Sequence, residues 1–142
     1  MNKQPIAIFS TDWHIKDDNV EQIIDLVTQQ CELAKKLGVK ELICLGDVFN
    51  SRKSQTLQCL GAFEEILNIV GDYQLILTCI SGNHDRTDYE SEKSFLDPFK
   101  HHPNLVLIND YNTITFDGVN LHLIPFFKES LWLEKFNEYK FD

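Results

Sequence analysis

The chain has 142 residues, 43% hydrophobic and 25% charged, a balance that fits one globular domain over 1–142 and excludes wholesale disorder. Its 22 acidic residues outnumber its 13 basic residues, and the net charge of −9 excludes nucleic-acid binding through a broadly basic surface. Binding of nucleic acid through metal ions stays open, because such ions add positive charge. No apolar run reaches about 18 residues, so we expect no membrane span.

The cysteines indicate a reduced, cytoplasmic protein. None of them forms a C-x-x-C pair, and each lies inside an apolar pattern. We therefore expect buried free thiols rather than a zinc site or disulfides. The four residues are Cys31, Cys44, Cys59 and Cys79.

The first 85 residues predict strands and helices in alternation. Short apolar runs at 6–9, 42–45 and 75–80 are typical of strands buried on both faces. Between them, apolar residues at helical spacing predict helices over 20–37, with a buried stripe from Val20 to Leu37, and over 57–70. Two consecutive βαβ units follow from this order, and such units build a parallel sheet.

The remaining residues predict a different arrangement. The polar segment 86–93 indicates a loop, 94–101 a short helix and 105–108 a further strand. Strands at 113–116 and 119–124 flank Asp117-Gly118, a strong hairpin signal. For residues 128–139 the pattern does not distinguish a helix from a loop, so both predictions stay open.

Polar side chains follow each of the three buried strands. In strand order they are Asp12 and His14, then Asp47, then Asn83, His84 and Asp85. Parallel strands place their carboxyl ends at one edge of a sheet, where ligands bind, so we expect these side chains to meet there. Any one of these groups alone fits a helix cap or a turn, whereas three groups at one edge favour a functional site.

The chemistry of this cluster is that of metal ligands. Asp12 and His14 are one residue apart, so both can face one ion while Trp13 points away. The carboxylate of Asp47 can bridge two ions, and Asn83 offers an amide oxygen. Two ions about 3.5–4 Å apart would clamp a phosphate and supply a hydroxide nucleophile. This mixture of ligands suits manganese, iron or zinc better than calcium.

Other polar residues carry weaker signals. Arg52 follows Asp47 closely. Two interpretations of this residue are equally open: contact with a substrate phosphate, or a solvated charge in a loop. We expect His101 and His102, beside a proline in a predicted loop, to be solvated. The same holds for His122, which lies between two leucines of a predicted hairpin strand.

Three segments resemble the first three motifs of calcineurin-like metallophosphoesterases: 12–14 (DWH), 46–52 (GDVFNSR) and 82–85 (GNHD). The likeness is greatest to the DNA-repair and recombination nucleases, which pair with Smc-like coiled-coil ATPases. Phe49, Arg52 and the segment 124–126 also resemble that branch. The resemblance implies an α/β calcineurin-like phosphoesterase core: a mostly parallel sheet, a C-terminal hairpin and helices on the outer faces, in an incomplete αββα sandwich.

The resemblance also implies the metal ligands. Asp12 and His14 would hold the first ion, Asp47 would bridge, and Asn83 would hold the second. The cofactor would be two divalent ions, with manganese as the first choice and iron or zinc as alternatives.

The same resemblance implies roles in catalysis. His84 would act as the acid that assists the leaving oxygen, and Asp85 would orient the free ring nitrogen of His84. Arg52 would bind substrate.

One departure from the family pattern affects the expected activity. The family's later Gly-His-x-His group is missing, so the second ion would have only Asp47 and Asn83 as ligands. The chain thus resembles the N-terminal part of a nuclease that stops early, and we expect weak or no activity from it alone.

The leading functional prediction is a metal-dependent phosphodiesterase, the nuclease subunit of a DNA repair or recombination complex, cleaving DNA by a metal-activated hydroxide. One alternative is a non-catalytic module that docks the partner ATPase. Another is a phosphoesterase acting on a different phosphate ester. A homodimer, and the choice between exonuclease and endonuclease, also stay open.

Overall fold

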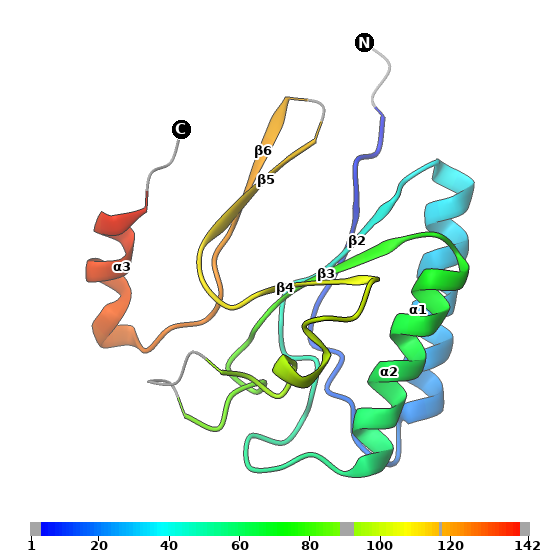
Figure 1. The fold of residues 1–142 in the computed structure, drawn as a ribbon, viewed down its shortest axis with the longest axis horizontal. Coiled ribbons are helices and arrows are strands. Elements are labelled where there is room, and N and C mark those ends of the chain that lie inside the picture. The colour runs from blue at the N-terminus through cyan, green and yellow to red at the C-terminus, as the bar shows by residue number, and fades with distance from the viewer. Residues whose placement is uncertain (1–3, 89–92, 117, 140–142) are drawn as a thin grey trace.

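The computed structural model describes residues 4–88, 93–116 and 118–139, which form an α/β fold with two sheets (Figure 1). The larger sheet is parallel, in the order β1 (Ile8–Ser10), β2 (Glu41–Cys44), β3 (Ile76–Ile80) and β4 (Leu105–Ile108). The smaller sheet is an antiparallel hairpin of β5 (Asn112–Phe116) and β6 (Val119–Leu123). The predicted parallel sheet and hairpin are both confirmed.

Two helices, α1 (Val20–Leu37) and α2 (Leu57–Asp72), lie side by side over one face of the larger sheet (Figure 1). The predicted bounds of α1 are confirmed, and α2 runs two residues further than expected. Leu37 is 43% exposed rather than buried. It shares an exposed stripe with Leu26 and Leu33, whereas the core-facing residues of α1 lie on the adjoining stripe of the helix.

The hairpin covers part of the other face of the sheet. Ile43 and Ile108 pack there against Leu123 of β6. On the same face Phe9 and Val106 stay 47% and 42% exposed. The expectation that the first strand is buried on both faces is therefore wrong, because β1 is an edge strand that only one layer of helices covers.

The segments outside the βαβ units are less regular than predicted. The short helix expected over 94–101 is a single 3-10 turn, η1 (Asp97–Phe99). The tail forms a 3-10 turn, η2 (Glu129–Leu131), that leads into α3 (Trp132–Glu138). Part of the predicted loop, 89–92, and Asp117 of the predicted turn lie outside the described residues.

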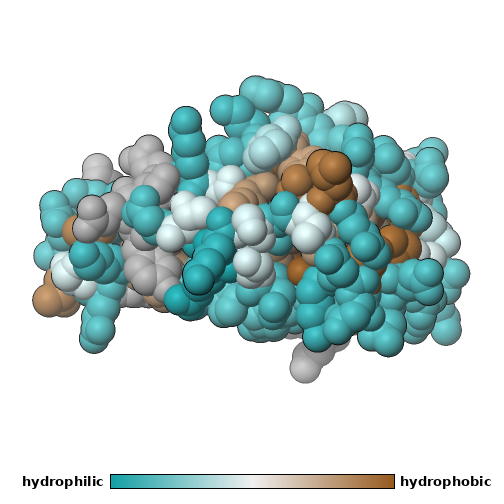
Figure 2. Space-filling view, turned by 90° about the horizontal axis from the view of Figure 1, so that it is seen from below, coloured by the Kyte–Doolittle hydropathy of each residue, from teal (hydrophilic) through white to brown (hydrophobic). Residues whose placement is uncertain are grey.

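The structure has a largely hydrophilic face and buried thiols, in agreement with the composition. Figure 2 shows hydrophilic side chains over most of one face, with small hydrophobic patches between them. All four cysteines are free and buried, as expected. Within the described ranges, no helix is long and apolar enough to cross a membrane.

Candidate metal centre

The segments that follow β1 and β2 run side by side beyond the edge of the sheet. The amide of Asp12 donates to the carbonyl of Gly46 at 3.1 Å, and that of His14 donates to the carbonyl of Asp47 at 3.0 Å. These bonds continue the parallel pairing of the two strands after the strands themselves end. Residues 34 and 33 positions apart in sequence are thereby held side by side.

This pairing brings together three of the residues singled out from the sequence. Asp12, His14 and Asp47 each offer a ligand atom, and these atoms lie within 4.8 Å of one another. Asp12 is exposed, and the other two are half-buried. Trp13 turns away into the core, 3% exposed, where its indole donates to Ser10 Oγ at 3.1 Å.

The backbone at these three residues is strained. Asp12, His14 and Asp47 have φ values of 55°, 48° and 55°, in the left-handed region that residues with a side chain seldom adopt. Only one other non-glycine residue in the described ranges, Gln74, has a positive φ. Such conformations cost about 1–3 kcal/mol each and cluster at functional sites, where the surrounding structure maintains them. Here the cross-segment hydrogen bonds supply that support.

Two glycines let the segments after β2 and β3 approach closely. A Cβ atom on Gly46, whose φ is +99°, would lie 2.8 Å from the Cα atom of Gly82. A Cβ atom on Gly82 would collide with the backbone nitrogen and carboxylate of Asp47. Both positions therefore require glycine, and their contact brings the turn after β3 against the cluster.

His84 lies in this turn, beside the cluster. Its amide donates to Asp47 Oδ1 at 2.9 Å, and its ring centroid is 4.9 Å from that of His14. Its Nδ1 is 2.7 Å from the carbonyl of Asn50. Because a carbonyl can only accept, Nδ1 carries the proton and Nε2 is left for other contacts.

Asp85 does not orient the His84 ring, and this expectation is wrong. Its carboxylate accepts from the amides of Gly82 at 2.9 Å and Phe49 at 3.0 Å, and Asp85 is fully buried. Burial raises the pKa of this carboxyl, and the two amides act in the opposite direction. Asp85 thus closes the turn and ties it to the segment after β2, while the carbonyl of Asn50 takes the expected orienting role.

The amide of Asn83 lies between Asp47 and Arg52. With its nitrogen toward Asp47, it donates to both carboxylate oxygens at 3.0 Å, and its oxygen accepts from Arg52 Nη2. In the opposite orientation, the amide oxygen of Asn83 faces the two carboxylate oxygens of Asp47. A cation beside these three oxygens would offset their repulsion. Sequence reasoning paired Asn83 with Asp47, and the structure brings the two into contact.

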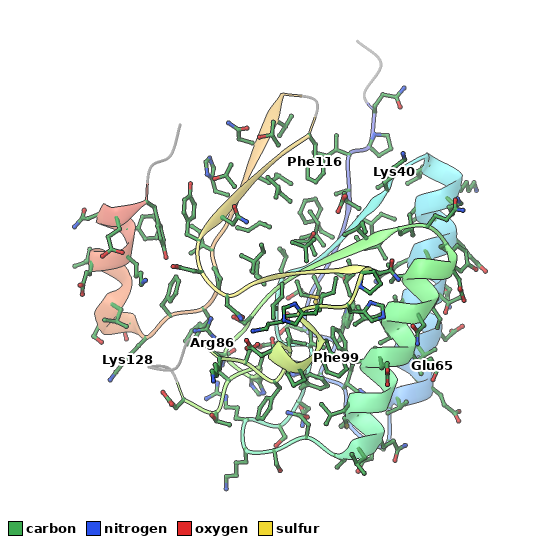
Figure 3. All side chains as sticks on the ribbon, viewed as in Figure 1. Lys40, Glu65, Arg86, Phe99, Phe116 and Lys128 are labelled. Carbon is green, nitrogen blue, oxygen red and sulfur yellow. The ribbon has the colours of Figure 1, made fainter. Side chains whose placement is uncertain are left out.

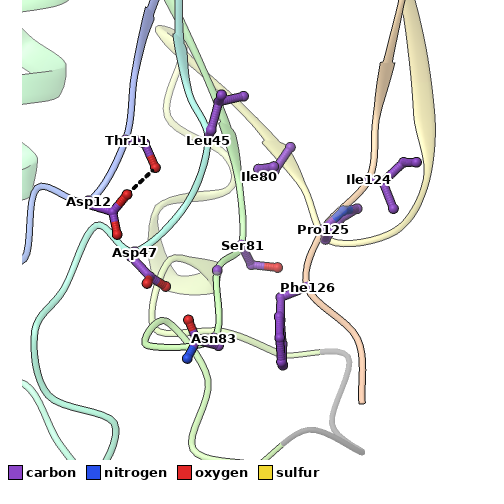
Figure 4. A pocket seen from close by; sticks show the side chains of 11 residues that line it. Thr11, Asp12, Leu45, Asp47, Ile80, Ser81, Asn83, Ile124, Pro125 and Phe126 are labelled. Carbon is purple, nitrogen blue, oxygen red and sulfur yellow. Dashed lines mark hydrogen bonds between the residues drawn. The ribbon is translucent and has the colours of Figure 1, made fainter. Parts of the chain in front are cut away.

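A cavity of about 280 Å³ opens beside these residues (Figure 4). Asp12, Asp47 and Asn83 form its polar side, where the hydroxyl of Thr11 donates to Asp12 at 2.7 Å. The opposite side is largely apolar, and its residues are Leu45, Ile80, Ile124, Pro125 and Phe126.

The donor set fits a divalent ion. Within the described ranges, Nδ1 of His14 is buried and has no hydrogen-bond partner, and Nε2 of the same ring lies 3.4 Å from Asp12 Oδ1. A cation among Asp12, His14 and Asp47 would offset the charge of the two carboxylates, whose ligand atoms lie within 4.8 Å of that of His14. The mixture of carboxylate, imidazole and amide suits manganese, iron or zinc.

The remaining histidines lie away from this cluster. His101 is exposed as expected, and His102 is half-buried and accepts from the amide of Asn104 at 3.2 Å. His122 is also half-buried rather than solvated, because Tyr111 stacks on its ring and hydrogen-bonds to it at 2.9 Å.

Sequence reasoning missed two residues that hold the site. Asn19 lies at the N-cap position of α1, but its side chain makes no capping bond; its amide donates instead to the carbonyl of His14 at 3.1 Å. Arg86 is 3% exposed and bonds to the ends of two strands, although it falls in a polar run that indicates a loop.

Comparison with known proteins agrees with these motifs. The sequence pattern of the calcineurin-like phosphoesterase family matches residues 6–140. The chain is 31% identical over 126 residues to exonuclease subunit 1 of Enterobacteria phage T4, covering 83% of this chain and 37% of that protein. Nuclease MPE of Pseudomonas putida is similar in structure, with a TM-score of 0.46 and 19% identity over 72% of this chain and 46% of the other. The family match spans nearly the whole chain, which therefore belongs to the calcineurin-like phosphoesterase family.

Proposed function

We propose that this protein hydrolyses phosphodiesters with the help of divalent metal ions, and that DNA is its substrate. The observation that carries the proposal is the meeting of Asp12, His14 and Asp47, all in left-handed backbone conformations, at one edge of the sheet. Strain of this kind persists where function requires it. The exonuclease name of the phage T4 relative supports DNA as the substrate.

The proposed metal ligands follow from the positions of these side chains. Asp12 and His14 would hold one ion, Asp47 would be shared, and Asn83 would contribute to a second. Bound ions supply a water of lowered pKa and offset the charge of the phosphate. Manganese is the proposed ion, because the ligand set mixes oxygen and nitrogen donors.

Two further residues would act on the substrate. With both ring nitrogens protonated, His84 would donate the Nε2 proton to the leaving oxygen and become neutral, while its Nδ1–H stays bonded to the carbonyl of Asn50. Arg52, exposed and beside Asn83, would bind a phosphate oxygen.

A role within a larger assembly is also proposed. The chain spans 37% of the length of the phage T4 protein, whose name marks it as a subunit. Leu133 and Phe136 of α3 are 82% and 43% exposed, a feature that suits contact with another chain. We therefore propose a complex with a coiled-coil ATPase of the Smc type, in DNA repair or recombination.

The experiment that tests the proposed function is a cleavage assay with labelled single- and double-stranded DNA and with bis(p-nitrophenyl) phosphate. It compares this chain with a version extended to the length of the T4 relative. We expect manganese-dependent hydrolysis that EDTA abolishes, strong in the extended chain and weak or missing in residues 1–142. Hydrolysis of phosphomonoesters alone by the extended chain, or no hydrolysis at all, would contradict the proposal.

A further inference from the structure

Arg86 is a buried cation next to the turn that carries Asn83 and His84. Arg86, which Figure 3 labels, follows the Gly82–Asp85 turn. Only 3% of its surface is exposed. Burying a charge is costly unless it is paired and hydrogen-bonded, so a buried arginine indicates a specific task. The proposed function gives Arg86 no contact with substrate or metal.

The guanidinium of Arg86 joins the beginning of the turn to the end of the neighbouring strand. Its Nε and Nη2 donate to Ser81 Oγ at 3.1 and 2.6 Å, and Nη2 also donates to the carbonyl of Asn109 at 2.9 Å. Ser81 in turn donates its amide to the carbonyl of Ile108 at 3.2 Å and accepts from the amide of Phe126 at 3.1 Å. Arg86 therefore connects the turn to the residue that follows β4, and Ser81, which Arg86 holds, connects it to β4 and to the segment after β6.

Between Ser81 and Arg86, the turn makes the contacts that set the site. The amide of Gly82 is held by Asp85, and the amide of His84 is held by Asp47. The side chain of Asn83 reaches Asp47 from the same turn. The position of Asn83 and His84 thus depends on both ends of the turn staying fixed.

We infer that Arg86 is a positioning residue that fixes the 81–86 turn, so that Asn83 and His84 face Asp47. Arginine suits this role because its planar fork presents several donors at once, whereas the ammonium of lysine is a single point of charge. The effect of Arg86 on the turn does not depend on the proposed function. Its effect on metal binding rests on that function.

The first test measures amide hydrogen exchange by NMR in the metal-free protein. In Arg86→Ala, we expect the amides of Gly82 and His84 to exchange roughly tenfold faster or more than in wild type. Arg86→Lys should lie between the two, and free guanidinium ion should slow exchange in Arg86→Ala again. Val70→Ala, which opens a cavity under α2, is the control for general destabilisation. It should leave the exchange rates of the Gly82 and His84 amides nearly unchanged relative to those of neighbouring amides.

The second test measures Mn²⁺ affinity of the same variants by titration. Loss of a residue that orients ligands typically lowers metal affinity about 10- to 100-fold, so Arg86→Ala should fall in this range and Val70→Ala should match wild type. If Arg86→Ala does not fold, Ser81→Ala removes the accepting hydroxyl and should change both readouts in the same direction, by less.

The outcomes separate the two proposals. Unchanged exchange at Gly82 and His84 in Arg86→Ala, or an equal change in Val70→Ala, would overturn the role of Arg86. Wild-type protein that binds no Mn²⁺ would instead overturn the proposed function, while the exchange result would still decide the role of Arg86.

Discussion

At the scale of single residues, the candidate site combines two carboxylates and an imidazole with strained backbone. Asp12, His14 and Asp47 adopt left-handed φ values, and hydrogen bonds between neighbouring segments hold them there. His84 is fixed through its amide and through Nδ1. Substitutions at this scale should therefore separate metal binding from chemistry.

His84→Ala should lower the rate of DNA cleavage while Mn²⁺ affinity stays close to wild type. Loss of a general acid typically costs about 10²–10⁴-fold in rate. The rate is measured in a form of the protein that cleaves DNA, with His122→Ala, in the hairpin, as the matched control. An unchanged rate in His84→Ala would remove this residue from the mechanism.

Arg52→Ala should raise KM for DNA about tenfold or more, with a smaller effect on kcat. Arg52 is the cation that contacts Asn83, and a charge-assisted bond to phosphate is worth roughly 1.5–3 kcal/mol. Lys53→Ala removes the neighbouring exposed cation and serves as the control. Equal effects of the two variants would show that the general charge of the loop matters rather than the placement of Arg52.

At the scale of elements, the site depends on two strand–turn junctions that touch. Gly46 and Gly82 have no room for a side chain, so the segments after β2 and β3 meet backbone to backbone. By contrast, a Cβ atom on Gly61, inside α2, would meet nothing within 4 Å.

Gly82→Ala should therefore lower the melting temperature and weaken Mn²⁺ binding together, because the new methyl group displaces Asp47. Gly61→Ala should leave metal binding intact and stabilise the protein by up to about 1 kcal/mol through better helix propensity. Thermal unfolding with and without Mn²⁺ compares the two. Normal metal affinity in Gly82→Ala would show that the close approach of these segments is not needed.

The core face of α1 gives a prediction for alkaline pH. Burial, with a smaller contribution from Glu32, raises the pKa of the Cys31 thiol from 9.0 to about 11. The unfolded chain then loses this proton first, so the stability that the thiol contributes is present below pH 9 and declines as the pH rises toward about 11. Urea unfolding should show a smaller loss over this range in Cys31→Ala than in wild type; parallel losses would contradict the assignment.

Much of this arrangement could be predicted from the sequence. Apolar periodicity gave the bounds of α1 and β4, and the order of elements put Asp12, Asp47 and Asn83 at one sheet edge. Contacts between distant segments could not be predicted. Nothing local shows that the carbonyl of Asn50 meets His84, or that Arg86, in a polar run, is buried against β4.

The error over Asp85 has a related cause. A carboxylate next to a histidine suggests an orienting pair, but the tight turn directs the Asp85 side chain to the amides of Gly82 and Phe49. The exposed face of β1 was missed because an apolar run does not reveal whether its strand lies at the edge of the sheet.

At the scale of the whole molecule, an acidic protein is proposed to act on a polyanion. With a net charge of −9, the protein as a whole is repelled electrostatically by DNA. Bound divalent ions at the sheet edge would reverse the charge locally. In the proposed function, both substrate binding and hydrolysis therefore depend on the metal centre.

The most direct test of this claim is calorimetric titration of residues 1–142 with Mn²⁺, comparing wild type, Asp47→Asn and Asp25→Asn. Asp25 lies on the exposed side of α1 and controls for the loss of one negative charge. We expect wild type and Asp25→Asn to bind Mn²⁺ alike, and Asp47→Asn to lose about tenfold or more in affinity, since its side chain would serve both ions. Equal affinity in all three proteins, or no binding by wild type, would contradict the account.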